Sequence, residues 1–207
     1  MKSCIKLYQK DIDDSEKEYI IKNCKFITID TETTGLEPLK DKLCLIQIYD
    51  GSNVFILRYN KELEYKNLVE ILESKKIQKV FHHANFDLRF LIANFKNIDI
   101  KNVVCTKVSA KLLNGKNENS SLKYLVEKYI GINISKELQI SNWESDNLSQ
   151  AQIEYAANDV IFLYKLWDKV SDILKENKIE NIAQNCFQYL PTNAMLHNKG
   201  IENIFIY

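Results

Sequence analysis

The sequence predicts an α/β protein with a mixed, five-stranded sheet flanked by helices. In the first half of the chain, short apolar runs rich in β-branched residues alternate with segments of helical spacing. The second half follows helical spacing for most of its length. Strands that alternate with helices are typical of a sheet covered by helices. With 5 Gly and 2 Pro in 207 residues, the chain has no long flexible linker, so we expect one domain over residues 1–207.

Five segments have the length and composition of buried strands. The second and third are separated by Asp50, Gly51, Ser52 and Asn53, which suit a hairpin connection. In chain order, the expected strands are Lys25–Thr31, Leu43–Tyr49, Val54–Leu57, Ile77–Phe81 and Ile100–Cys105.

Capping residues mark the ends of several helices. Ser121 is expected to cap a helix over Leu122–Ile130, which Gly131 then ends. Ser149 and Gln152 fit a capping box at the start of a long helix, whose apolar pattern continues to Leu174. Two earlier segments also follow helical spacing, Leu63–Leu72 and Phe86–Phe95.

Composition and charge restrict the class of protein. The chain carries 28 basic and 28 acidic residues, and this neutrality disfavours an extended nonspecific nucleic-acid track while leaving a very short substrate plausible. The N-terminus lacks the apolar core of a signal peptide, and no apolar run approaches the length of a membrane span. Five cysteines without a CxxC pair suit a reducing compartment. We therefore expect a cytoplasmic protein with no membrane association.

Asp30 and Glu32 are two residues apart at the end of the first expected strand, in the run ITIDTETTGL. A period of two places both carboxylates on one face of a strand, where they can share one cation. The alternative is that both are solvated in a strand-end turn, for which Thr33, Thr34 and Gly35 supply the turn chemistry.

Three further candidates interrupt apolar stretches. Asp87 begins an apolar helix, where an acid is also favoured by the helix dipole alone. Tyr155 and Asp159 are four apart in the long helix and share a face. An acid buried among apolar residues needs a partner, and a set of acids without evident Lys or Arg partners indicates a metal cation.

The residue types suit metal-assisted phosphodiester hydrolysis. Mg²⁺ and Mn²⁺ prefer the hard oxygen ligands that Asp and Glu supply. Two such ions activate a water and stabilise the leaving oxygen, and a tyrosine hydroxyl beside them can orient that water. Such a site needs no Ser, Cys or His nucleophile.

The segments DTETTG, HHANFD and YAAND resemble the three motifs of the DEDD exonuclease superfamily. The tyrosine four residues before the last aspartate resembles the DEDDy branch, and LCLIQIYDG is similar to ribonuclease D. The similarity extends from about Lys25 to Trp167. It implies an RNase H-like (DnaQ-like exonuclease) fold, two divalent cations bound by Asp30, Glu32, Asp87 and Asp159, a water-positioning role for Tyr155, and 3′→5′ removal of nucleotides.

A narrower resemblance is to nano-RNase C, a compact relative of ribonuclease D. It rests on VVCTKVSAKLL, NISKELQISNW and CFQYLPTNAML. The resemblance implies action on dinucleotides and very short oligonucleotides, and a ring-shaped octamer. The sequence has Ala84 and Asn85 where that family has Gly-Arg, which puts phosphate contacts there in doubt.

By the same resemblance, we expect substrate contacts from Thr33, Leu36 and His82. Leu36 would wedge against a base, with ordinary packing as the alternative, and His82 would approach a phosphate, with a core histidine as the alternative. Lys107 and Lys111 suit a basic rim or a merely solvated helix face. Trp143 is expected to be a structural anchor.

The expected function is hydrolysis of short single-stranded RNA or DNA, dinucleotides above all, to nucleoside 5′-monophosphates. The alternatives are ribonuclease D-type trimming of longer RNA, a DNA exonuclease, and a nucleic-acid-binding scaffold without catalysis. The C-terminal segment 186–207 is apolar at several positions and needs cover, either from its own domain or from a neighbouring subunit of a homo-oligomer.

Overall fold

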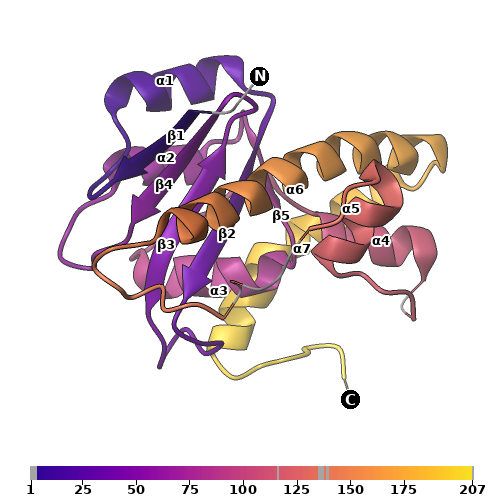
Figure 1. Ribbon diagram of the computed structural model, residues 1–207. Helices are drawn as coiled ribbons and strands as arrows, with labels where there is room; N and C mark the ends of the chain where they lie inside the picture. The colour runs from indigo at the N-terminus through magenta and orange to yellow at the C-terminus, as the bar shows by residue number, and fades with distance from the viewer. Residues whose placement is uncertain (1–3, 116, 135–137, 139, 207) are drawn as a thin grey trace.

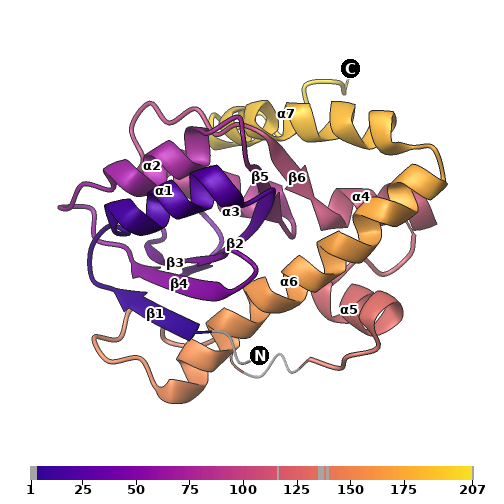
Figure 2. The ribbon, with the colours of Figure 1, turned by 90° about the horizontal axis from the view of Figure 1, so that it is seen from above.

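The computed structural model describes residues 4–115, 117–134, 138 and 140–206. It forms a six-stranded mixed sheet with helices on both faces (Figures 1 and 2). The strands are β1 (Cys4–Tyr8), β2 (Phe26–Thr33), β3 (Leu43–Tyr49), β4 (Asn53–Arg58), β5 (Gln78–Phe81) and β6 (Val103–Cys105). The helices are α1 (Asp14–Asn23), α2 (Lys66–Glu73), α3 (Ala84–Asn94), α4 (Thr106–Asn114), α5 (Leu122–Ile130), α6 (Gln150–Glu176) and α7 (Glu180–Asn198).

The strand order is β1-β4-β3-β2-β5-β6, and β2 lies near the middle. β2 pairs with β3 antiparallel and with β5 parallel, and β6 extends the sheet parallel to β5. The mixed α/β class predicted from the sequence is confirmed, and each of the five expected strands is present.

The prediction of five strands was one short, because β1 forms the sixth, at an edge and parallel to β4. Its residues are only partly buried, and Leu7 is 52% exposed. An edge strand has one unpaired side, so its sequence need not show the continuous apolar run of a central strand. The pattern CIKLY therefore carries a weak strand signal.

Two boundaries also differ from prediction by more than two residues. The helix expected from Leu63 begins at Lys66, and Leu63 is exposed in a turn in which its N–H donates to the carbonyl of Asn60. Tyr65 prevents the helix from extending toward the N-terminus, because its hydroxyl donates a hydrogen bond to the Arg58 carbonyl of β4. The last expected strand is shortened to Val103–Cys105 after Asn102, which has a positive φ of 52°.

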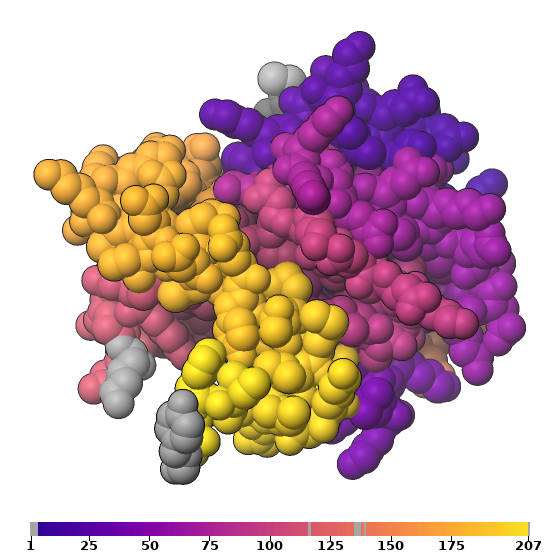
Figure 3. Space-filling view, turned by 180° about the vertical axis from the view of Figure 1, so that it is seen from behind, coloured from indigo at the N-terminus to yellow at the C-terminus, as the bar shows by residue number. Residues whose placement is uncertain are grey.

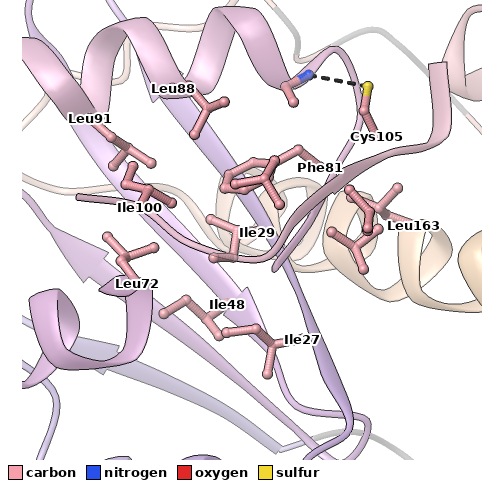
Figure 4. Close-up of a cluster of buried hydrophobic side chains, with 14 of the residues drawn as sticks. Ile27, Ile29, Ile48, Leu72, Phe81, Leu88, Leu91, Ile100, Cys105 and Leu163 are labelled. Atoms are coloured by element: carbon pink, nitrogen blue, oxygen red, sulfur yellow. Dashed lines mark hydrogen bonds between the residues drawn. The ribbon is translucent and has the colours of Figure 1, made fainter. Parts of the chain in front are cut away.

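The main core lies between the sheet and the layer of α1, α2 and α3. Alternate residues of β2 and β3, such as Ile29 and Ile48, point into it and meet Leu72 of α2 and Leu88 of α3 (Figure 4). The same view shows the Ala84 N–H donating to the Cys105 sulfur at 3.4 Å, which ties the start of α3 to the end of β6.

α6 covers the opposite face of the sheet and crosses β2, β3 and β4 (Figure 2). The predicted capping box is confirmed: the Ser149 side chain accepts from the Gln152 N–H, and the Gln152 side chain accepts from the Ser149 N–H. The predicted N-cap at Ser121 and the left-handed Gly131 at the end of α5 are confirmed too.

The C-terminal segment is divided between core and surface. α7 packs on α3 and places Phe187, Leu190 and Ala194 in the main core. Beyond α7, Ile204, Phe205 and Ile206 are exposed. The C-terminal part of the chain, yellow in Figure 3, lies in the lower part of that view. Within the described ranges, no helix combines the length and apolarity needed to cross a bilayer.

Candidate active site

Asp30 and Glu32 project from the C-terminal half of β2 toward α6. Thr28 marks this face of the strand, because its hydroxyl donates to the Val160 carbonyl of α6 at 2.7 Å. Residues two and four positions further along a strand point the same way. The register with β3 shifts between Glu32 and Thr33, so regular pairing is interrupted immediately beside the two acids.

α6 brings the third carboxylate to this face. One ligand oxygen from each of Asp30, Glu32 and Asp159 lies within 4.8 Å of the other two. Asp159 and Tyr155 are one helical turn apart, so both side chains are directed to the same side of α6. Acids separated by almost 130 residues in the sequence thus form one cluster.

Asp87 joins the group from α3, on the other side of β2. It is 1% exposed, and its Oδ1 accepts a hydrogen bond from the Thr31 hydroxyl at 2.7 Å. Its Oδ2 is buried and has no hydrogen-bond partner among the described residues. A buried carboxylate oxygen without a donor is a position that a cation can fill.

The electrostatics of the cluster favour a cation. Burial raises the pKa of Asp30 well above its usual range, and the charges of Asp87 and Asp159 raise it further. Burial raises the pKa of Glu32 to about 10, again with a contribution from the neighbouring acids. Burial raises the pKa of Asp87 to about 7, although the Thr31 hydrogen bond opposes the shift. The four residues therefore fit a divalent cation. They supply only oxygen ligands, and their ionised carboxylates need a positive charge beside them.

Tyr155 lies at the edge of the cluster and is held by Trp143. The two rings are 6.0 Å apart, and Trp143 is 2% exposed, which confirms the predicted anchor. The loop that carries Trp143 is fixed by Arg58, whose guanidinium donates to the carbonyl oxygens of Asp146 and Ser145. Burial raises the pKa of Tyr155, and the Asp159 charge raises it further, so the hydroxyl keeps its proton at neutral pH.

The three expected substrate residues lie in different surroundings. Leu36 is 72% exposed in the loop that follows β2. Thr33 is partly buried, and its hydroxyl donates to the Gly35 carbonyl at 2.6 Å, as in the turn interpretation. His82 follows β5, and its Nδ1 is 2.9 Å from the Thr106 hydroxyl. The next residue, His83, has a left-handed φ of 63°, and burial followed by the Lys107 and Lys111 charges lowers its pKa to about 4.

The loop that carries Leu36 is fixed at both ends. Glu37 pairs with Arg89 of α3 at 3.1 Å, and its N–H donates to the Asp41 carboxylate at 2.8 Å. Gly35 leaves room for that carboxylate, because a Cβ added there would lie 2.4 Å from it and the Asp41 side chain would have to move. Lys42 pairs with Glu144, next to the loop of Trp143. Leu36 is therefore an exposed apolar side chain on an ordered loop.

Asn85, where the resemblance expected arginine, bonds to α7. Its Nδ2 is 2.9 Å from His197 Nδ1, and its Oδ1 accepts from the Asn193 amide at 2.9 Å. The side chain is thereby engaged in joining α3 to α7.

Sequence reasoning missed two residues that contact or border the acids. Thr31 belongs to a β-branched run and was assigned only to a strand, and its link to Asp87 depends on the placement of α3. Gln47 is fully buried in the central strand β3. A polar residue inside the apolar run LCLIQIY was the available signal.

This fold and this arrangement of acids define a class. A family model described as 3′-5′ exonuclease matches residues 9–189. The chain therefore belongs to this 3′-5′ exonuclease family. The family is divalent-metal dependent, in agreement with the acidic cluster.

Among solved structures, the chain is similar to Brucella melitensis NrnC with bound Mg²⁺, with a TM-score of 0.89, 31% identity and 99% of each chain covered. NrnC bound to pGG matches at a TM-score of 0.88 and 32% identity, over 100% of both chains. Escherichia coli RNase D, at 20% identity and a TM-score of 0.73, shares the fold. The predicted closeness to nano-RNase C is confirmed by these NrnC neighbours.

Curated relatives include DNA polymerase I of Aquifex aeolicus, 33% identical over 156 residues, and ribonuclease D of Haemophilus influenzae, 26% identical over 181 residues. These matches cover 75% and 87% of this chain. They cover 25% of the polymerase and 45% of the ribonuclease D, so the chain spans less than half of either relative.

Proposed function

We propose that the chain is a two-metal exonuclease of the DEDDy type that cleaves short oligonucleotides, dinucleotides above all, into nucleoside 5′-monophosphates. The observation that carries the proposal is the joint cluster of Asp30, Glu32 and Asp159, with Tyr155 one turn away from Asp159. The preference for short substrates is supported by the likeness to NrnC over the full length of both chains, including a structure bound to pGG.

In this proposal, Asp30, Glu32, Asp87 and Asp159 hold two divalent cations, either Mg²⁺ or Mn²⁺. When bound, such ions supply an activated water and stabilise the leaving oxygen. Tyr155 contributes a protonated hydroxyl that hydrogen-bonds to the attacking water and orients it. Trp143 and the Arg58-bound loop keep that hydroxyl in place.

Leu36 suits a base-contacting role because it is apolar, exposed and mounted on a fixed loop. A base that leaves its stack gains apolar contact with such a side chain. Thr33 lies between Glu32 and Leu36 in the sequence, and His82, which follows β5, suits a phosphate contact.

The chain also suits a homo-oligomer, with an octamer as the expected form. Ile204, Phe205 and Ile206 are exposed, as are Leu36 and Leu39. Exposed apolar residues of this number are typical of surfaces that meet a partner. A closed assembly would surround each site and restrict the length of strand that enters.

Substrate length and metal dependence are tested together. Labelled RNA and DNA of two, five and twenty nucleotides are incubated with the enzyme and Mg²⁺, with and without excess EDTA. We expect the two-nucleotide substrate to be cleaved fastest and EDTA to abolish cleavage. The Asp30→Ala protein should fold and lose orders of magnitude in rate. Faster degradation of the twenty-nucleotide RNA would favour ribonuclease D-type trimming, and faster degradation of long DNA would favour a DNA exonuclease.

Assembly is tested by light scattering on the 24.2 kDa chain. We expect an octamer, and a protein truncated after Gly200 should dissociate while its core stays intact, because α7 is retained. Truncation after Asn185 would instead remove Phe187 and Leu190 from the core. A full-length monomer at micromolar concentration would refute the assembly.

A further inference from the structure

Gln47 is the most unusual polar residue near the acids. It is 0% exposed, and neither its Oε1 nor its Nε2 has a hydrogen-bond partner within the described ranges. Burying an amide without partners is unfavourable, so a side chain of this kind needs an explanation beyond packing. Leucine or methionine would fill similar space without leaving polar atoms unsatisfied.

The side chain of Gln47 is on the α6 face of the sheet. Its neighbours two positions away on β3, Leu45 and Tyr49, pack in the cluster under α6. Ile46 and Ile48 pack in the main core on the opposite face. Because alternate residues of a strand share a face, Gln47 points the same way as Asp30 and Glu32.

In the register of β2 and β3, Gln47 lies directly opposite Asp30. Side chains in such antiparallel pairs have Cβ atoms about 4.5–5.5 Å apart. On its other side, Gln47 is paired with the apolar Ile56 of β4. Ala156, Ala157 and Val160 of α6 contribute further apolar surface to this layer. Of the two cross-strand partners of Gln47, Asp30 is therefore the polar one.

We infer that Gln47 is a positioning residue for Asp30: its amide N–H donates to the Asp30 carboxylate when cations hold that carboxylate ionised. A neutral donor suits this place because it orients the carboxylate without cancelling the negative charge that attracts the metals. A lysine there would compete with the cations. This inference rests on the proposed function, in which Asp30 is a metal ligand.

The test replaces Gln47 by leucine and measures three properties. Metal-free Gln47→Leu should melt at the wild-type temperature or above, because the substitution removes from an apolar layer an amide that has no hydrogen-bond partner there. Calorimetric titration with Mg²⁺ and Mn²⁺ should show binding weakened roughly 10- to 100-fold, as for other residues that orient metal ligands. At saturating metal, kcat for a dinucleotide should fall while KM stays within about twofold, because the substrate is not touched.

Two further variants act as controls. Gln47→Met keeps the length of the side chain without its donor and should reproduce the leucine result. Ile56→Val changes packing in the same layer one strand further from Asp30, and should leave metal binding at the wild-type value. Should both Gln47 variants fail to fold, the inference is tested on the wild-type protein by the NMR signal of the Gln47 side-chain amide. It should shift on saturation with Mg²⁺.

The outcomes separate this inference from the proposed function. If wild type binds metal and cleaves dinucleotides, but Gln47→Leu does both equally well, the inference is wrong and the function stands. An amide signal that does not move with Mg²⁺ also refutes the inference. If wild type binds no metal, the function and the inference both fail.

Discussion

Asp87 shows at the residue scale how the fold retains an acid in its interior. One oxygen is satisfied by Thr31, and the other has no partner among the described residues. The same side chain is 1% exposed, so water does not replace the missing donor at the surface. An isolated buried carboxylate is unfavourable, and an acid in this state is stabilised either by a proton or by a cation.

Tyr155 provides a residue-scale prediction. Replacing it by phenylalanine keeps the ring on Trp143 and removes only the hydroxyl. We expect kcat to fall roughly 100-fold, as for loss of one oriented hydrogen bond in an active site. Metal binding measured by calorimetry should stay unchanged, because the hydroxyl is not a proposed ligand. Equal losses in metal binding and kcat would instead make Tyr155 part of the metal site.

The residues that could be predicted from sequence are those with a local signal. Asp30, Glu32 and Asp159 interrupt apolar runs, and the structure places their oxygens together. Gln47 could not be assigned a role, because its meaning depends on the strand that lies opposite it. The same holds for Arg89, whose partner Glu37 is 52 residues away.

At the scale of the element, α6 carries the last motif and is positioned by its N-terminal cap. Gln152 contributes twice, because its side chain closes the capping box and its amide also donates to the Ser141 hydroxyl at 2.9 Å. The start of α6 is thus joined to the loop that holds Trp143. Loss of the cap would therefore also disturb the position of Tyr155, which is in the second turn of the helix.

Ser149→Ala tests this cap. The substitution removes the oxygen that accepts from the Gln152 N–H, and we expect it to lower the free energy of unfolding by about 1 kcal/mol. Urea titration followed by circular dichroism measures the change. Ser171→Ala is the matched control, because Ser171 is within the same helix and, among the described residues, its hydroxyl bonds only to the Asp168 carbonyl. If the two variants lose equal stability, the cap has no special role.

Element prediction succeeded where burial was complete and failed at the edges. β3 is buried at every position, and its apolar run was sufficient to locate it. β1 is half exposed, and only its pairing with β4 makes it a strand. Leu63 fits the helical spacing of α2, yet the turn at Asn60 and the bond from Tyr65 to β4 exclude it from the helix. The bond from Tyr65 cannot be recognised before β4 is placed.

At the scale of the whole molecule, the acid cluster links stability to pH. The folded-state pKa of Asp87 is raised to about 7 and that of Glu32 to about 10, above the usual range of a carboxyl in an unfolded chain. Between the unfolded and folded values, the folded state binds more protons, so its stability falls as pH rises. The stabilising contribution is complete below about pH 4 and is lost progressively toward pH 10.

We therefore expect the melting temperature of the metal-free protein to fall between pH 5 and pH 9, relative to Glu32→Gln. The comparison with this variant cancels other titrating groups, among them His83, whose pKa is lowered. Adding Mg²⁺ at pH 8 should restore stability to the wild type and much less to the variant. Differential scanning calorimetry measures both effects. Parallel pH curves for the two proteins would show that the acids are not coupled to folding.

The hydrogen bond from Thr28 to Val160 joins residues 132 positions apart, and it has a consequence for the order of synthesis. At about 5–20 residues per second, a ribosome makes β2 on the order of ten seconds before α6. During that interval the nascent chain carries Asp30 and Glu32, and then Asp87, without Asp159. The acid cluster can therefore form only after α6 has been made and has packed on the sheet.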